Sequence, residues 1–279
     1  MNDLMSLMSL PVIESKQNTQ FKKLQKIVSS NKYRQDNKLF WIEGEKLSKS
    51  FFENMKMNGN LLLVFDQKTN KKLIINFCLK NNIKEVNFTC LSSSLFREIS
   101  QIENSPGWGV VANYPTNNFS ETKEIKDVVI LDGVQDPGNL GNIIRTSAAV
   151  GIENIWVTKS TSDPYSPKAI RAGSAGQFIT KFSFFSDLNE ILNRNEISKM
   201  QILATVVRSK SVNLYDTKLD LKKNCAWLFG SEGRGISSTA IEKNKLLSLN
   251  IPHIAKIESL NVAIAVAVCL FEMKRQRLS

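Results

Sequence analysis

The chain has 279 residues, of which 42% are hydrophobic and 23% are charged. This length exceeds one average domain and the apolar content suffices to bury a core, so we expect two domains. No apolar run approaches the roughly 18 residues of a membrane span, and the methionine-rich start lacks the basic flank and the cleavage site of a signal peptide. These features predict a soluble, cytoplasmic protein with no membrane partner.

The net charge is +11, from 37 basic and 26 acidic residues. Such an excess favours a polyanionic partner, because phosphate attraction supplies most of the sequence-independent affinity for nucleic acid. Lysine accounts for 28 of the 37 basic residues, and the abundance of Lys, Asn and Ile can also reflect nucleotide bias in the genome. Residues 1–113 carry 16 basic and 10 acidic side chains (+6), so the shorter half is the denser in positive charge.

Cysteine and histidine usage argues against metal and disulfide chemistry. Cys78, Cys90, Cys225 and Cys269 show no Cys-x-x-Cys spacing, and His253 is the single histidine. A structural zinc site, a centre of several histidines and a disulfide framework are therefore not expected, and we expect the cysteines to be buried as small hydrophobic side chains. A Ser-His-Asp triad would have to use His253, which no Gly-x-Ser-x-Gly elbow accompanies.

The N-terminal part predicts a small α/β domain. Helical patterns cover Asn18–Ser30, Lys46–Met57, Asn70–Lys80 and Ser93–Ser100, and strands are expected over Leu39–Glu43, Leu61–Phe65, Glu85–Thr89 and Gly109–Tyr114. Basic and aromatic residues interleave at Lys32-Tyr33-Arg34-Gln35, so Lys32 and Arg34 are candidate nucleic-acid contacts. The polar, turn-rich run that starts at Tyr114 predicts a linker. We therefore place the domains at 1–114 and 127–279, with the linker at 115–126.

The α/β alternation restarts at Val128. Strands are expected over Val128–Leu131, Asn154–Thr158, Gln201–Val207, Cys225–Gly230 and Leu247–Ile251, and helices near Asn139–Val150, Asp187–Ile197, Ile236–Lys243 and Ser259–Arg275. After the first strand come two turns and a helix that Asn139 can cap. Asn139, Asn142 and Arg145 then repeat at three-residue spacing. Either this is a ligand site at the carboxyl end of a strand, or it is a solvated helix face with a structural arginine.

Three further segments of this half contain candidate site residues. Trp227–Ile236 is an apolar strand that enters a glycine-rich loop, which matches neither a Walker loop nor a dinucleotide fingerprint and can be an ordinary strand-to-helix turn. Leu249–Cys269 joins a strand to a helix rich in alanine and valine, whose small side chains permit close packing. Asp163–Gly176 is basic and contains glycines; its Lys168 and Arg171 can contact a phosphate backbone, or the segment is a solvated loop.

Together these segments resemble the motifs of the SpoU (TrmH-like) branch of the SPOUT RNA 2′-O-ribose methyltransferases. DPGNLGNIIRTSAAVG is similar to the first motif of that family, LFGSEGRGIS to the second, and NIPHIAKIESLNVAIAVAVCLFE to the third, in the same order and with fitting intervals. The run from Ile13 to Leu47 is like the substrate-binding domain of the members that act on ribosomal RNA. The resemblance covers nearly the whole chain.

The resemblance implies a parallel α/β domain with a deep trefoil knot, preceded by a small α/β RNA-binding domain. It implies an S-adenosylmethionine-dependent enzyme that works as a homodimer through the C-terminal domain. The expected reaction is methylation of a ribose 2′-hydroxyl of RNA, with 23S ribosomal RNA as the substrate and a guanosine as the modified nucleotide. Carried over residue by residue, it assigns cofactor contacts to Gly230, Ile251, Leu260 and Thr205. It assigns catalysis and ribose placement to Asn139, Arg145, Glu232, Ser259 and Asn261, with Lys32, Arg34, Lys168 and Arg171 as RNA contacts.

Proposals for the family make the arginine a general base. A guanidinium has a pKa above about 12, so we expect Arg145 to stabilise the developing alkoxide while an RNA phosphate accepts the proton. We expect Glu232 to orient Arg145 or nearby hydroxyls. His253 departs from the family pattern, where an unbranched apolar residue is common, and the region from Arg171 to Gly176 varies within the family.

Three alternatives remain open at this point. A transfer-RNA 2′-O-methyltransferase is the nearest, and the N-terminal resemblance favours ribosomal RNA over it. A non-catalytic RNA-binding paralogue should have lost Asn139, Arg145, Glu232 or Asn261, and all four are present. A nucleotide-dependent oxidoreductase would need a dinucleotide fingerprint after its first strand, which is missing.

Overall fold

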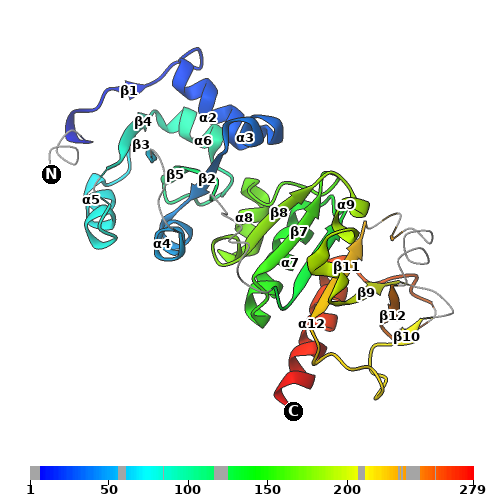
Figure 1. The fold of residues 1–279 in the computed structure, drawn as a ribbon. Helices are drawn as coiled ribbons and strands as arrows, with labels where there is room; N and C mark the ends of the chain where they lie inside the picture. Colours follow the sequence, from blue (N-terminus) through cyan, green and yellow to red (C-terminus); the bar gives the residue numbers. More distant parts are fainter. Residues whose placement is uncertain are drawn as a thin grey trace. The chain divides into compact units, whose positions relative to one another are not determined.

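The computed structural model describes residues 7–55, 61–83, 85–115, 125–206, 211–231, 233, 235–236, 246–254 and 256–279. The chain divides into two compact units, which are labelled by element in Figure 1. Unit 1 comprises Met1–Thr116 together with Tyr165–Ile170, and unit 2 comprises Asn117–Pro164 together with Arg171–Ser279. None of the helices in the described part of the chain is long and apolar enough to cross a membrane.

Unit 1 is a five-stranded sheet with helices on both faces. Its strands are β1 (Val12–Ile13), β2 (Leu39–Glu43), β3 (Leu62–Asp66), β4 (Asn87–Leu91) and β5 (Trp108–Asn113), in the order β1-β4-β3-β5-β2. Its helices are η1 (Leu7–Ser9), α2 (Thr19–Ser29), α3 (Asn31–Asn37), α4 (Glu45–Asn54), α5 (Lys71–Lys80) and α6 (Ser93–Ile99). β5 runs antiparallel to both of its neighbours, β2 and β3, whereas β4 is parallel to β3 and to β1.

Helix α2 covers one face of this sheet. Asn18 caps it, because its side chain accepts hydrogen bonds from the backbone N–H groups of Gln20 (2.9 Å) and Phe21 (3.2 Å). Phe21, Leu24 and Ile27 then recur at helical spacing and are buried in one cluster with residues of β2–β5 and α6. The opposite face is covered by α4 and α5 (Figure 1). Phe52 of α4 packs against Phe77 of α5, which in turn packs against Trp108.

Unit 2 contains a seven-stranded parallel sheet. Its strands are β6 (Val128–Asp132), β7 (Asn154–Thr158), β8 (Lys181–Phe185), β9 (Gln201–Thr205), β10 (Val212–Asn213), β11 (Cys225–Gly230) and β12 (Leu247–Asn250), in the order β10-β12-β9-β11-β6-β7-β8. Its helices are α7 (Pro137–Val150), η2 (Gly176–Phe178), α9 (Leu188–Leu192), α10 (Asn195–Ser198) and α12 (Val262–Leu278). The short helix α8 (Pro167–Gly173) contains the division between the units.

The parallel pairings confirm the expected α/β class. The sheet is buried on both faces, as parallel sheets require. Val128, Ile130 and Leu228 join a core cluster with apolar residues of α9 and α10. On the other face the indole N–H of Trp227 donates to the Met273 sulfur of α12 at 3.3 Å, and α12 lies against α7.

An ion pair attaches the last turn of α12 to the sheet. Arg277 donates to both carboxylate oxygens of Asp127 at 2.6 and 2.9 Å and to the backbone carbonyls of Leu221 and Lys223. Asp127 also accepts from the backbone N–H of Cys225 at 3.0 Å. The hydrogen bonds to Asp127 raise the pKa of Arg277 above its usual value. One carboxylate and one guanidinium therefore hold together the start of β6, the start of β11 and the end of α12.

The four cysteines are free and buried, as expected from their spacing. Burial raises the pKa of the Cys78 thiol to about 11 and that of the Cys225 and Cys269 thiols to about 12. Thiolates are the reactive form of cysteine, so these three side chains behave as small hydrophobic groups near neutral pH.

Several expected elements differ in detail. Asp136 caps α7 in place of Asn139: its side chain accepts from the Asn139 N–H at 2.8 Å, with Pro137 at the first helical position. The single helix expected over Asp187–Ile197 is two short helices, α9 and α10. The strand β8 and the helix α3 were not predicted. The helix expected over Ile236–Lys243 lies outside the described residues except for Ile236.

Candidate active site

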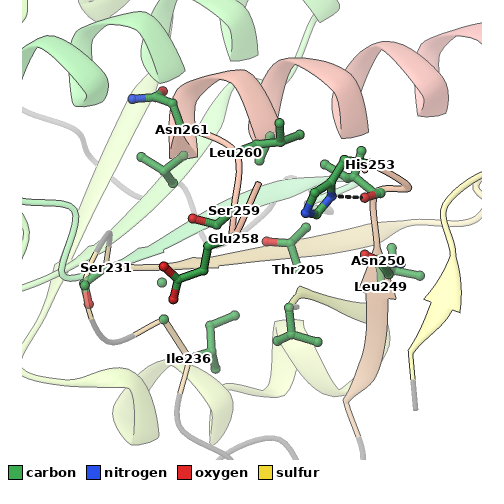
Figure 2. Close-up of a pocket in the computed structure, with 17 residues that line it drawn as sticks. Thr205, Ser231, Ile236, Leu249, Asn250, His253, Glu258, Ser259, Leu260 and Asn261 are labelled. Atoms are coloured by element: carbon green, nitrogen blue, oxygen red, sulfur yellow. Dashed lines mark hydrogen bonds between the residues drawn. The ribbon is translucent and has the colours of Figure 1, made fainter. Parts of the chain in front are cut away.

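A pocket of about 560 Å³ opens at the carboxyl ends of β9, β11 and β12 (Figure 2). Ligands of parallel α/β sheets bind at this edge. Its lining comes from the end of β9, the glycine-rich turn after β11, and the segment from β12 to the start of α12. The lining residues are Thr205, Val206, Gly230, Ser231, Gly233, Gly235, Ile236, Leu249, Asn250, Ile251, His253, Glu258, Ser259, Leu260, Asn261, Val262 and Ala265.

The turn after β11 folds tightly back on the strand end. The Gly235 N–H donates to the Ser231 carbonyl at 2.9 Å, and Gly235 has a φ of +62°, a conformation that favours glycine. A Cβ built on Gly230 would lie 2.4 Å from the carbonyl carbon of Gly235 and 2.5 Å from its oxygen. Only a residue without a side chain fits there, so backbone groups of the turn form one wall of the pocket.

The segment after β12 supplies the opposite wall and its polar groups. The Nδ1 atom of His253 lies 2.7 Å from the Ile251 carbonyl oxygen, the contact drawn as a dashed line in Figure 2. Glu258 brings a carboxylate to the pocket, and Ser259 a hydroxyl. Across from them, Thr205 at the end of β9 brings a second hydroxyl. The pocket therefore combines apolar walls with hydroxyl, carboxylate and backbone groups.

A hydrogen bond joins the first and third motifs. The Asn261 amide nitrogen donates to the Asn139 side-chain oxygen at 3.0 Å. The Asn261 side-chain oxygen caps α12, because it accepts from the backbone N–H groups of Ala263 (2.9 Å) and Ile264 (3.3 Å). One side chain thus starts α12 and orients Asn139, which is 122 residues away in the sequence.

Arg145 lies on α7 with its side chain exposed and is not among the pocket-lining residues. It follows Asn139 by six residues, about 9 Å along the helix axis. The turn η2 packs on α7 beside it: a Cβ on Gly176 would lie 3.2 Å from the Cα and the N of Arg145. The backbone of Arg145 is therefore held firmly while its guanidinium faces outward.

The structure brings together most of the residues expected at the site. Thr205, Gly230, Ile251 and Leu260 all line the pocket, and so do Ser259 and Asn261. Asn139 reaches it through Asn261. Glu232 lies outside the described residues. His253, which the sequence singled out as the single histidine and as a departure from the family pattern, also lines the pocket. Glu258 was not predicted, although its place next to Ser259 in the third motif was a signal that could have found it.

The expected RNA contacts divide into exposed and buried side chains. Lys32, Lys168 and Arg171 are exposed. Arg34 is only 3% exposed, and its guanidinium donates to the backbone carbonyls of Ile27 (2.9 Å) and Val28 (3.1 Å). These bonds join α3 to the last turn of α2, so we correct the expectation for Arg34: it is a structural residue of unit 1.

Among the described residues, no group of three or more His, Cys, Asp or Glu side chains is placed to hold a metal ion. The polar side chains of the pocket instead carry hydroxyl, amide, carboxylate and imidazole groups.

Residues 126–271 match the model of the SpoU rRNA Methylase family. This match covers more than half of the chain. The protein belongs to the SpoU rRNA methylase family. The family predicted from the three motifs is thereby confirmed.

Two relatives illustrate how far the similarity of this SpoU methylase extends. An uncharacterized tRNA/rRNA methyltransferase of Synechocystis sp. is 36% identical over 171 residues, which are 61% of this chain and 61% of that protein. The match thus spans less than two thirds of that relative. The 23S rRNA (guanosine(2553)-2′-O)-methyltransferase RlmP of Bacillus subtilis is 26% identical over 273 residues, which are 94% of this chain and 98% of that protein.

Solved structures agree with the fold over nearly the full length. The AdoMet-bound rRNA methyltransferase from Sinorhizobium meliloti has a TM-score of 0.80 and 24% identity, and the similarity covers 96% of this chain and 99% of that one. The SpoU methyltransferase AviRb from Streptomyces viridochromogenes, in complex with AdoMet, also has a TM-score of 0.80, with 22% identity and coverages of 94% and 99%. At these identities the likeness concerns the fold.

The tight turn after β11 yields a prediction about cofactor binding. Gly230→Ala should weaken binding of S-adenosylmethionine, the cofactor that the motifs imply, by about tenfold or more, because its Cβ must displace the backbone of Gly235. Gly233→Ala is the comparison within the same turn: Gly233 also lines the pocket, but a Cβ there meets no protein atom within 4 Å. Calorimetric titration measures the affinities of the parent protein and both variants, and parent-like affinity of Gly230→Ala would contradict the prediction.

Proposed function

We propose that the protein transfers a methyl group from S-adenosylmethionine to a ribose 2′-hydroxyl of RNA, and that its substrate is 23S ribosomal RNA, at a guanosine. One observation carries the proposal: the second and third motifs form a single pocket, and Asn261 connects that pocket to Asn139 of the first motif. The name of the Bacillus relative, which matches over 98% of its length, supports the substrate. The name of the Synechocystis relative includes transfer RNA, which the experiment below therefore tests separately.

The pocket fits the cofactor by size and by chemistry. Its volume of about 560 Å³ lies in the ordinary range for small-molecule sites. Apolar side chains such as Ile236 and Leu249 suit a nucleobase, while the Thr205 hydroxyl and the Glu258 carboxylate can bind ribose hydroxyls or an ammonium group. When bound, S-adenosylmethionine supplies an electrophilic methyl group on a sulfonium centre.

The protein then has to position the ribose and favour the alkoxide that develops on its 2′-oxygen. Positioning at about 3 Å supplies several kcal/mol of the barrier. We propose that Asn139, which accepts a hydrogen bond from Asn261, and Ser259, which lines the pocket, hold the ribose. Arg145 is exposed and lies outside the pocket lining, and we propose that its guanidinium contacts the RNA and not the cofactor. There it stabilises the negative charge and does not act as a base, because a guanidinium holds its proton.

Unit 1 is proposed as the RNA-binding domain, with the boundary in residues 115–126. Its N-terminal 113 residues carry a net charge of +6, which attracts a phosphate backbone. Exposed Lys32 and, from the segment after β7, Lys168 and Arg171 are proposed contacts. We place the enzyme in the cytoplasm, where its RNA substrate is found and where cysteines remain reduced.

A trefoil knot is proposed for the C-terminal part of unit 2. The similarity of fold to SpoU methyltransferases supports it. A second support is the tight turn after β11, in which Gly235 lies against Gly230 at the end of the strand. This turn and the segment that leads into α12 line the same pocket. An experimental map that traces residues 206–262 without a break tests whether the chain passes through its own loop.

A homodimer through unit 2 is proposed from the outer face of α12. Ile264 and Phe271 are seven residues apart, so they share one side of the helix, and they are 55% and 54% exposed. Exposed apolar side chains in a row mark an interaction surface. Analytical ultracentrifugation should therefore show a dimer that Phe271→Glu converts to a monomer. The control is Leu79→Glu on α5, which also replaces an exposed apolar side chain and should leave the dimer intact. A monomeric parent protein would contradict the proposal.

Transfer of a labelled methyl group tests the function itself. The native protein should label unmodified 23S ribosomal RNA, and Arg145→Ala should lower the rate by about 100-fold or more through the loss of alkoxide stabilisation. Arg145→Lys should restore little of this, because an ammonium lacks the planar set of donors. Arg194→Ala, at another exposed arginine, is the control.

If only transfer RNA were labelled, the proposed ribosomal substrate would be wrong and transfer RNA would be the substrate. Absence of label on free RNA and on ribosomal subunits, together with retained cofactor binding, would favour a non-catalytic RNA-binding protein. Near-native turnover of Arg145→Lys would count against the demand for a guanidinium.

The bond between Asn261 and Asn139 can be tested without loss of the helix cap. Asn261→Asp keeps an oxygen for the N–H groups of Ala263 and Ile264 but removes the N–H donor to Asn139. The free energy of unfolding should stay within about 1 kcal/mol of that of the parent protein, while the rate of methyl transfer falls. An unchanged rate would show that Asn139 needs no orientation by Asn261.

A further inference from the structure

Unit 1 has a pocket of its own, of about 840 Å³, on the sheet face that α2 covers. It lies at one end of the sheet, where β2, β3 and β4 begin and β5 ends, because Leu39 pairs with Asn113 and Leu62 with both Asn87 and Val111. Its lining residues are Thr19, Gln20, Lys23, Leu24, Ile27, Tyr33, Leu39, Leu61, Leu62, Asn87, Phe88, Val111 and Asn113.

The lining is apolar at the bottom and polar at the rim. Leu24, Ile27 and Val111 are between 1% and 4% exposed and belong to the core of the unit. Tyr33 is a half-buried aromatic side chain at the opening. Phe88 also borders the pocket, but it pairs with Leu63, so its ring lies on the opposite face of the sheet. Such a site favours a flat ligand with apolar faces and a polar edge, which describes a nucleobase.

Polar groups around the opening match the rest of a nucleotide. Gln20 and Asn87 carry amides, which both donate and accept hydrogen bonds as the edges of bases do. Lys23 is exposed on the rim. Lys26 lies on the same helix with its ammonium 5.7 Å from the centre of the Tyr33 ring. The sequence of α2, TQFKKLQKIVS, contains no acidic residue, so its surface attracts phosphate.

We infer that this pocket binds one unpaired nucleotide of the RNA substrate, with its base stacked on Tyr33 and its phosphate near Lys23. The inference rests on the proposed function, which supplies RNA as the ligand. It adds a specificity site: the unit selects RNA that presents an unpaired base, because a base inside a duplex cannot enter a pocket. A substrate RNA must then meet two separate requirements: a ribose that fits the methyl-transfer site and an unpaired base that fits this pocket.

Photo-cross-linking of the full chain tests the contact directly. The probe is an RNA stem-loop of ribosomal sequence with 5-iodouridine either in the loop or in the stem. Loop-labelled RNA should cross-link to peptides that contain Tyr33, and stem-labelled RNA should not. Cross-links that map only to other peptides, or no cross-link from the loop position, would overturn the inference.

Affinity measurements give an independent test. Lys23→Ala and Tyr33→Leu should each weaken binding to the stem-loop by about fivefold or more, as loss of a phosphate contact or a stacked base does, and leave binding to a fully paired stem less affected. Tyr33→Phe keeps the ring and should bind like the parent protein. Lys22→Ala is the matched control for charge, because Lys22 is the neighbouring exposed lysine and bonds to Gln17 outside the pocket.

The two proposals fail in different ways. If the parent protein methylates RNA but Lys23→Ala and Tyr33→Leu bind the stem-loop as Lys22→Ala does, the pocket is not a nucleotide site and the methyltransferase function stands. If the parent protein methylates no RNA yet the variants lose selective binding to the loop, the nucleotide site stands without the enzymatic function. Because the Tyr33 ring packs on the core, Lys23→Ala and the cross-links keep the inference testable if Tyr33→Leu is unstable.

Discussion

The register between β6 and β11 is the constraint on which the site depends. The two strands are parallel neighbours in the middle of the sheet, and Gly230 pairs with Asp132. Their carboxyl ends therefore lie side by side, so the loop that leads to Asn139 and the turn that begins at Gly230 start from adjacent points. The two faces of these strands pack against different side chains, those of α9 and α10 on one face and those of α12 on the other. A slip by one residue would exchange the side chains of the two faces and disrupt both sets of contacts, so this packing keeps the register.

On that frame, polar contacts between distant segments complete the site. Asn261 caps α12 and bonds to Asn139, so the start of the C-terminal helix and the orientation of a first-motif side chain are set by the same residue. The other end of α12 is attached by Arg277 to Asp127, directly before β6. The helix is thus attached at its start to α7, which carries the first motif, and at its end to the residue before β6. Positioning is the main demand of methyl transfer, and this arrangement meets it with backbone turns and two side-chain contacts.

Local patterns in the sequence were sufficient for most elements, and they failed where a contact outside the pattern decided the outcome. The strands Leu39–Glu43, Asn154–Thr158 and Cys225–Gly230 were predicted with their observed bounds, because apolar runs between turns have few alternatives. Asn139 was expected to cap α7, yet Asp136 does so, since either residue suits the position and the backbone of the preceding turn decides between them. The strand β8, Lys181–Phe185, was missed although its aromatic residues favour a strand.

By itself the sequence determined the alternation of strands and helices in two α/β regions, the absence of paired cysteines and the three motifs that place the chain in the SpoU rRNA methylase family. Only the tertiary structure decided that Arg34 is buried against carbonyls of α2, that Glu258 and His253 line the same pocket as Thr205, and that unit 1 contains a second pocket beneath α2. The reason is physical: spacing along a chain reports which face of an element a side chain occupies, but distance between segments is set by packing. The sequence around Arg34, a basic residue next to Tyr33, would be the same whether its side chain faced solvent or the end of a neighbouring helix.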